Sequence, residues 1–504
     1  MDDLLELSAT EMVALLRSRE LSSRELVEAH LQRIDAVDPT LNAVVTLDAD
    51  GAREAADDAD RLTAAGAAVG PLHGLPMTHK DTHRTRGMRT TQGSPVLQDA
   101  VPEEDDLIIG RLRRAGVIST GKTNVPEFGA GSHTFNEVFG TTRNPYAPDR
   151  SAGGSSGGVA AAVAARIQPL GEGSDMGGSL RIPASFCNVV GFRPSYGVIP
   201  MPSPVDAWQW LGRTGPMART VDDIALFMSA VAGPAPEVTP RAPLDGNAFT
   251  APLDTTMEGV RIGWSPDFGI GIPVERAVLD VLEAQLSVFE DMGATVEEAS
   301  IDLAEADAVF RAHRAMTFAA GLGDLVRRHR DLIKPEVVWN VEQGWALTAQ
   351  DWIDTTAAAT RLQQHVRSFF HRFDLFLSPA AQVVPFDAGL RYPAEVAGQP
   401  SETYLDWMRS ACVLSATSLP VLSVPAGFTP EGLPVGFQLA VDHYQDVQLL
   451  RYGKAFEECT GWAARRPDLL QKVASSAGRH DPAAPLARRE QHGDLHALDH
   501  LGPA

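Results

Sequence analysis

Two groups of serines, each flanked by glycines, lie close together in residues 153–190, and they are the first residues of the chain to indicate chemistry. Ser155 and Ser156 stand within the run Gly-Gly-Ser-Ser-Gly-Gly at 153–158. Ser179 follows the sequence Met-Gly-Gly a short distance downstream. Glycine lets the backbone turn sharply and approach a ligand closely. A serine in such a turn is therefore a candidate nucleophile.

A nucleophilic serine needs a base within hydrogen-bond reach and donors for the oxyanion that forms on the attacked carbonyl. The best candidate base is Lys80, which lies in the sequence Gly-Leu-Pro-Met-Thr-His-Lys-Asp of residues 74–81. The pKa of a free lysine is about 10.4, and burial can lower it by about 3 to 5 units. Ser155 can then bridge Lys80 and Ser179. The candidate oxyanion donors are the backbone N–H groups of Met176, Gly177 and Gly178.

These residues resemble the amidase signature family, whose serine hydrolases use a Ser, cis-Ser, Lys triad. Separations of 75 residues from Lys80 to Ser155 and of 24 residues from Ser155 to Ser179 match the pattern of that family. The resemblance continues to about Trp462 and includes further runs at 121–127, 144–146, 419–427 and 432–438. It implies that Ser179 is the nucleophile that forms an acyl-enzyme. It also implies that Ser155 is a bridging serine after a cis peptide bond, and that Lys80 is the final base and acid.

The resemblance also implies supporting roles. Asp175 and Arg181 are expected to form a buried pair that stiffens the nucleophile loop, and Ser156 to hydrogen-bond the lysine. The backbone of Phe128 and Gly129 is expected to form the wall that receives the scissile amide. Three residues depart from the usual family pattern, although none belongs to the triad: Ser174 replaces threonine, Leu180 replaces isoleucine and Arg193 replaces lysine.

Bulk composition limits the partners and the compartment. The chain has 504 residues, 44% of them hydrophobic, and a net charge of −22, which argues against nucleic acid and anionic membranes as partners. No apolar run approaches the ~18 to 20 residues of a membrane span. The acidic N-terminus lacks the basic start of a signal peptide. The three cysteines show no metal spacing, so we expect a reduced cytoplasmic protein.

The pattern of apolar residues predicts an α/β fold. Strands are expected at 43–46 and 117–119 and helices at 52–65 and 106–114, and this alternation favours a sheet with helices packed on it. The resemblance implies the amidase signature fold, so we expect one large domain over residues 1–470, with a central mixed β-sheet covered by helices on both faces. Residues 471–504 contain no aromatic residue and are expected to form a flexible C-terminal tail.

Two motif matches indicate other chemistry but lack the required context. Residues 116–123 have the spacing of a P-loop, yet the residues between the glycines are mostly β-branched and predict a strand, and Pro126 follows where a helix should continue. Residues 153–157 fit a nucleophile elbow, but a polar loop precedes them in place of a strand. Nucleotide binding and an ordinary α/β-hydrolase are therefore disfavoured.

The substrate is less well defined by the sequence. Tryptophans occur in the region that relatives often use for the substrate entrance and in the part where relatives vary most, namely Trp208, Trp210, Trp339, Trp345, Trp352 and Trp407. Several of these facing the pocket would favour an aryl or bulky apolar substrate.

The sequence thus predicts an amidase that hydrolyses a small-molecule amide through an acyl-enzyme, with no metal or organic cofactor. Three alternatives remain open. The first is hydrolysis of carbamates (urethanes) or esters by the same triad. The second is the A-type subunit of a glutamine-dependent amidotransferase, which shares the triad. The third is a non-catalytic binding or scaffold protein. The oligomeric state is also open, with a homodimer as one option.

Overall fold

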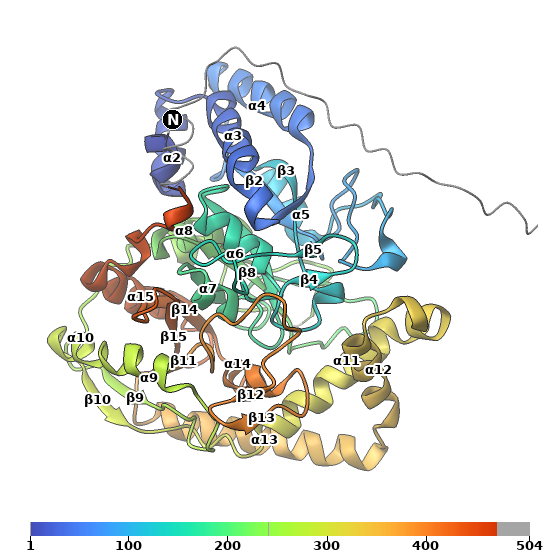
Figure 1. The fold of residues 1–504 in the computed structure, drawn as a ribbon. Helices are drawn as coiled ribbons and strands as arrows, with labels where there is room; N and C mark the ends of the chain where they lie inside the picture. Colours follow the sequence, from blue (N-terminus) through green and yellow to red (C-terminus); the bar gives the residue numbers. More distant parts are fainter. Residues whose placement is uncertain (1, 240, 471–504) are drawn as a thin grey trace, which may run out of the picture.

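The computed structural model describes residues 2–239 and 241–470, and Figure 1 shows their arrangement. The expected C-terminal tail, residues 471–504, lies outside the described residues. The strands of the described part are β1 Val44–Leu47, β2 Pro76–Lys80, β3 Ile118–Thr123, β4 Phe135–Asn136, β5 Gly140–Thr141, β6 Leu170–Asp175, β7 Val190–Arg193, β8 Arg213–Ala218, β9 Arg261–Trp264, β10 Thr295–Glu298, β11 Leu375–Pro379, β12 Glu395–Val396, β13 Gln399–Pro400, β14 Val421–Phe428 and β15 Pro434–Ala440. The α-helices are α1 Asp2–Glu6, α2 Ala9–Ser18, α3 Ser23–Leu41, α4 Ala49–Ala64, α5 Leu107–Arg114, α6 Gly157–Ala164, α7 Arg181–Phe186, α8 Val221–Val231, α9 Arg276–Glu283, α10 Leu286–Asp291, α11 Ala306–His329, α12 Pro335–Ala346, α13 Ala349–Phe370, α14 Arg409–Ala416 and α15 Asp446–Thr460.

A mixed sheet of eight strands forms the centre of this single domain. Its order is β10-β9-β11-β15-β14-β7-β8-β6. The β10, β9 and β11 strands run parallel to one another, and the other neighbouring pairs are antiparallel. The expected central mixed sheet is therefore confirmed.

Successive residues of the central strands enter different cores, because side chains alternate across a sheet. In β11, Leu375 and Leu377 belong to a core shared with α8, α9 and α15, whereas Phe376 belongs to a core shared with α7, α11 and α14. Strand β15 shows the same alternation, with Leu439 in the first core and Ala440 in the second. Helices thus cover both faces of the sheet (Figure 1).

A smaller three-stranded sheet, in the order β1-β3-β2, lies beside β6 and carries the candidate base. Side chains close to the edge of the large sheet complete the hydrogen bonding of β2. The N–H of Thr78 donates to Gln168 Oε1 at 2.8 Å, and the N–H of Lys80 donates to Glu172 Oε1 at 2.8 Å. These contacts fix the position of β2 relative to β6.

The elements expected from the sequence are present, with ends shifted by a few residues. The expected strands at 43–46 and 117–119 are β1 and β3, and the expected helices at 52–65 and 106–114 are α4 and α5. Most of the sequence with P-loop spacing lies in β3, which agrees with the rejection of nucleotide binding. None of the helices in the described residues is both long and apolar enough to span a lipid bilayer.

Candidate active site

Lys80 lies at the end of β2, and its amine is completely buried among serines. Its Nζ donates hydrogen bonds to Ser155 Oγ at 2.8 Å, to Ser156 Oγ at 2.9 Å and to Ser174 Oγ at 2.9 Å. All three acceptors are neutral, so none of them neutralises a charge on the amine. The expected contacts of Lys80 with Ser155 and Ser156 are both present.

Burial lowers the pKa of Lys80 from its ordinary 10.5 to about 7, although Asp175 and Glu172 act in the opposite direction. The charged form of a buried amine loses its hydration, and neutral hydroxyls do not fully replace it. A large fraction of Lys80 is therefore unprotonated near neutral pH. An uncharged amine in this position is able to accept a proton from Ser155.

Ser155 lies between Lys80 and the start of α6, and the Gly154–Ser155 peptide bond is cis, as the resemblance implies. The backbone approaches other segments closely here. A Cβ atom on Gly154 would lie 2.9 Å from Thr134 Oγ1 and 3.0 Å from the backbone N of His133. Only glycine fits at this position without displacing its neighbours.

Ser179 lies in the loop between β6 and α7. The φ angle of Gly178 is +105°, a conformation that favours glycine over any residue with a side chain. The N–H of Ser156 donates to the carbonyl oxygen of Ser179 at 3.2 Å, so the two serine loops are tied together. The hydroxyls of Ser155 and Ser179 form no hydrogen bond with each other in the described structure, but both border one cavity.

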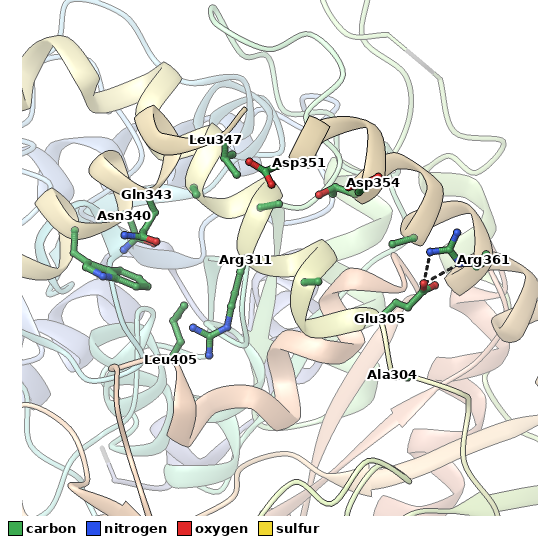
Figure 2. Close-up of a pocket in the computed structure, with 16 residues that line it drawn as sticks. Ala304, Glu305, Arg311, Asn340, Gln343, Leu347, Asp351, Asp354, Arg361 and Leu405 are labelled. Atoms are coloured by element: carbon green, nitrogen blue, oxygen red, sulfur yellow. Dashed lines mark hydrogen bonds and ion pairs between the residues drawn. The ribbon is translucent and has the colours of Figure 1, made fainter. Parts of the chain in front are cut away.

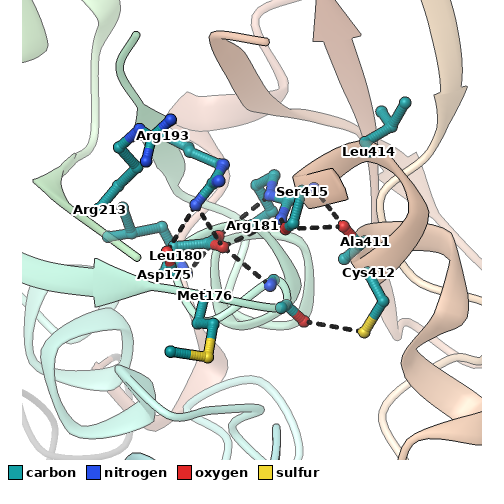
Figure 3. A network of polar contacts seen from close by, with 12 residues as sticks. Asp175, Met176, Leu180, Arg181, Arg193, Arg213, Ala411, Cys412, Leu414 and Ser415 are labelled. Atoms are coloured by element: carbon teal, nitrogen blue, oxygen red, sulfur yellow. Dashed lines mark hydrogen bonds and ion pairs between the residues drawn. The ribbon is translucent and has the colours of Figure 1, made fainter. Parts of the chain in front are cut away.

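Asp175 organises the loop that carries Ser179 (Figure 3). Its carboxylate accepts from the N–H of Gly178 at 2.9 Å and from the N–H of Leu180 at 3.1 Å. It also accepts from both Nε and Nη2 of Arg181 at 3.0 Å, and this pair is completely buried, as expected. Burial alone would raise the pKa of Asp175, but Arg181 and Arg193 outweigh it and hold the pKa well below its usual range.

The Asp175 carboxylate occupies one of the expected oxyanion donors. Because the N–H of Gly178 donates to Asp175, it is not free to bind a substrate oxygen. The N–H groups of Met176, Gly177 and Ser179 make no hydrogen bond within the described residues. These three groups are consequently available, and the expectation for Gly178 needs correction.

A cavity of about 180 Å³ joins these residues, and we name it the serine cavity. Phe128, whose φ angle is +50°, and Gly129 form one side of it. A Cβ on Gly129 would lie 3.4 Å from Ser155 Oγ, so this wall comes close to the bridging hydroxyl. The lining residues are Thr82, Gln92, Phe128, Gly129, Ser155, Ser174, Asp175, Met176, Ser179, Met201, Gln209, Gly212, Arg213, Arg314 and Phe318.

None of the tryptophans singled out in the sequence lines the serine cavity. Trp208, Trp210 and Trp352 line a separate cavity of about 660 Å³, and Trp407 is buried in the core. A third cavity of about 570 Å³ lies between α11, α12 and α13 (Figure 2). Trp339 borders this cavity. The aromatic side chains beside the candidate serines are instead two phenylalanines, Phe128 and Phe318.

Sequence reasoning missed Glu172, which is buried beneath Lys80. Its carboxylate accepts from the Lys80 N–H at 2.8 Å and contacts His79 Nδ1 at 3.2 Å and His83 Nδ1 at 3.4 Å. Burial would raise the pKa of Glu172, but the two histidines hold it well below its usual range. The signal in the sequence was an acidic residue within a glycine-rich strand, three positions before Asp175.

The structure also adds cations that the sequence did not single out for the site. Arg193, noted only as a departure from the family pattern, donates to the Asp175 carbonyl oxygen at 2.6 Å (Figure 3). Arg213 and Arg314 line the serine cavity and come from β8 and α11, far from the glycine-rich loops in sequence. No local pattern connects these arginines to Ser179.

Among the described residues, no group of three or more His, Cys, Asp or Glu side chains is arranged to hold a metal ion.

Comparisons with known proteins identify relatives of this chain. The family model described as Amidase matches residues 25–450. The acylamidase of Rhodococcus erythropolis is 35% identical over 465 residues, which cover 92% of this chain and 97% of the relative. The A-type subunit of the glutamyl-tRNA(Gln) amidotransferase of Thermosynechococcus vestitus is also 35% identical, covering 91% of this chain and 99% of that relative. The crystal structure of a bacterial aryl acylamidase of the amidase signature family is similar with a TM-score of 0.84 and 31% identity, covering 95% of this chain and 99% of that one.

Proposed function

The chain belongs to the amidase signature family, and we propose that it cleaves a small amide through an acyl-enzyme on Ser179. Its similarity to an acylamidase in sequence and to an aryl acylamidase in fold supports amide hydrolysis. The observation that carries this proposal is the buried amine of Lys80, 2.8 Å from Ser155 Oγ in the wall of the cavity that Ser179 also borders. The remaining steps follow from what these groups are able to do.

In the proposed reaction, neutral Lys80 accepts the proton of Ser155 while Ser155 takes the proton of Ser179. Ser179 Oγ then attacks the amide carbonyl carbon. The negative charge that develops on the carbonyl oxygen of the substrate is stabilised by the N–H groups of Met176, Gly177 and Ser179. Ser155 returns a proton to the leaving nitrogen, which departs as a neutral amine. Water then hydrolyses the ester on Ser179 through the same relay in reverse.

We further propose that the substrate carries an aryl or other bulky apolar group. Phe128, Met176, Met201 and Phe318 provide apolar surface in the serine cavity. The similar crystal structure with the TM-score of 0.84 is of an aryl acylamidase, which also favours an aromatic substrate. Apolar lining with a few polar groups is the usual composition of a site for such a ligand.

The test is a panel of three substrates, namely a 4-nitroanilide and a 4-nitrophenyl ester with the same acyl chain, and a urethane of 4-nitroaniline with an alkoxy group of similar length. We expect release of nitroaniline from the anilide, and the Ser179→Ala variant should lower kcat by at least about 10³-fold. Hydrolysis of the ester or the urethane without the anilide would replace the proposal by the corresponding alternative.

A further inference from the structure

Arg314 is a buried cation in the wall of the serine cavity. It projects from α11, its side chain is 3% exposed, and it borders the same space as Met176 and Ser179. A buried guanidinium is costly unless a counter-charge or hydrogen bonds compensate it. The partners of Arg314 therefore show what compensation is missing.

Every protein partner of this guanidinium is neutral. Nη2 donates to the Tyr404 hydroxyl at 2.7 Å, and Nε donates to the same hydroxyl and to Asn340 Oδ1, both at 3.1 Å. Nη1, on the side of the loop that carries Ser179, has only Met176 Sδ at 3.3 Å, and a thioether is a weak acceptor. The guanidinium also lies over the Phe318 ring at 4.4 Å. No carboxylate of the described residues forms an ion pair with it.

The serine cavity around Arg314 has an excess of positive charge. Asp175 is the only carboxylate among its lining residues, and Arg181 and Arg193 already pair with it. Arg213, the other lining cation, donates to backbone carbonyl oxygens and to Ser418 Oγ, which are also neutral. Each guanidinium nitrogen of Arg213 thus has an oxygen acceptor, whereas Nη1 of Arg314 has only a thioether.

We propose that Arg314 binds an anionic group of the substrate, so that the preferred substrates are amides that also carry a carboxylate. This inference rests on the proposed hydrolysis at Ser179. A carboxylate accepts hydrogen bonds from a guanidinium more strongly than a thioether does, and an ion pair in a dry cavity is stronger than one in water. Phe318, stacked on the guanidinium, provides apolar contact beside the charge.

Arg311 provides a matched control on the same helix. It lies three residues earlier, borders the cavity between α11, α12 and α13 (Figure 2), and pairs with Asp406 at 2.7 Å. It does not line the serine cavity. An Arg311→Met variant removes one arginine from α11 without changing the charge of the serine cavity.

The experiment measures kcat/KM for two substrate pairs that differ only in one anionic group. The first pair is succinyl 4-nitroanilide and its succinamide analogue, in which an amide replaces the free carboxylate on the acyl side. The second pair is 4-acetamidobenzoate and 4-acetamidobenzamide, which differ on the amine side. We expect the anionic member of at least one pair to be preferred by about tenfold or more, as for a hydrogen bond to a charged group.

The Arg314→Met variant should abolish this preference, Arg314→Lys should retain part of it, and Arg311→Met should leave it intact. Equal kcat/KM values within both pairs, or a preference that survives in Arg314→Met, would overturn the inference while leaving the hydrolase intact. If no amide is cleaved, the anion site is still tested by titration calorimetry on the full chain, which measures ligand binding directly. Binding of 4-acetamidobenzoate that is about tenfold tighter than that of 4-acetamidobenzamide and is lost in Arg314→Met supports the anion site, and equal binding refutes it.

Discussion

The chemistry of Lys80 depends on its surroundings more than on its identity. Its amine is surrounded by the hydroxyls of Ser155, Ser156 and Ser174 and by no carboxylate in direct contact among the described residues. Hydroxyls accept hydrogen bonds from either form of the amine but do not compensate a full charge. Lys80 is therefore poised between its two protonation states near neutral pH.

This environment predicts the pH dependence of the reaction. With a pKa of about 7, Lys80 is protonated in acid and then unable to accept the proton of Ser155. We expect kcat/KM on a neutral anilide to rise about tenfold per pH unit in acid and to level off above about pH 7. The measurement is an initial-rate profile from pH 5 to 9. Activity that remains constant down to pH 5 would contradict the role of Lys80 as base.

The two strands that meet at the site, β2 and β6, also determine how strongly Lys80 holds its proton. Glu172 on β6 accepts from the Lys80 backbone, and its charge raises the pKa of the Lys80 amine against the effect of burial. His79, adjacent to Lys80, and His83, three residues after it, contact the same carboxylate. The contacts of Glu172 with Lys80, His79 and His83 therefore hold β2 and β6 together at the base of the site.

Replacing Glu172 with glutamine should shift the acid limb of the pH profile. Glu172→Gln keeps an acceptor for the Lys80 N–H but removes the negative charge, so the pKa of Lys80 should fall and the midpoint should move to lower pH. The exposed Glu103→Gln variant serves as the control and should leave the midpoint unchanged. An unchanged midpoint in Glu172→Gln, with the fold intact by circular dichroism, would show that Glu172 does not act on Lys80.

The link between β6 and α7 depends on Asp175. Its carboxylate accepts from two backbone N–H groups of the nucleophile loop and from Arg181. We expect Asp175→Asn to lower the free energy of unfolding by about 3 to 5 kcal/mol, because it leaves buried arginines without their counter-charge. The exposed pair of Arg276 with Asp280 provides the comparison, and Asp280→Asn should cost less than about 1 kcal/mol. Urea unfolding of both variants measures the difference, and equal losses would refute this account of the loop.

Local sequence patterns predicted the site residues that lie on short segments. The glycine-rich runs around Ser155 and Ser179 and the strand before Lys80 carry their own signals, since glycine and apolar periodicity act over a few residues. Arg213 and Arg314 were not predicted, because their relation to Ser179 arises from β8 and α11 packing around the same cavity. Whether the tryptophans face the pocket stayed open, because the sequence does not reveal side-chain direction, and none of them lines the serine cavity.

The molecule as a whole combines segments from most of its length at one site. The base comes from the three-stranded sheet, the serines from loops around α6 and α7, and another wall from α11, and all of these elements belong to one domain. Each group that the proposed relay needs is consequently present in a single chain. The relay itself needs no second chain. Since the same triad occurs in A-type amidotransferase subunits, activity of the isolated chain is the observation that separates the two functions.

The purified chain alone should therefore hydrolyse a simple anilide at a rate that does not change with added cell extract. The amidotransferase relatives make a glutamine-dependent function the alternative to exclude. Glutamine hydrolysis, measured as ammonia release, should be much slower than anilide hydrolysis. Activity that appears only with added partner proteins would favour the amidotransferase alternative.

The most direct test of the central claim is to identify the residue that carries the acyl group. A fluorophosphonate that mimics the tetrahedral intermediate should label the active enzyme once, and tandem mass spectrometry should locate the adduct on Ser179. Labelling should be lost in Ser179→Ala and strongly slowed in Lys80→Ala. An adduct on a different residue, or undiminished labelling of Ser179→Ala, would contradict the assignment of Ser179 as nucleophile.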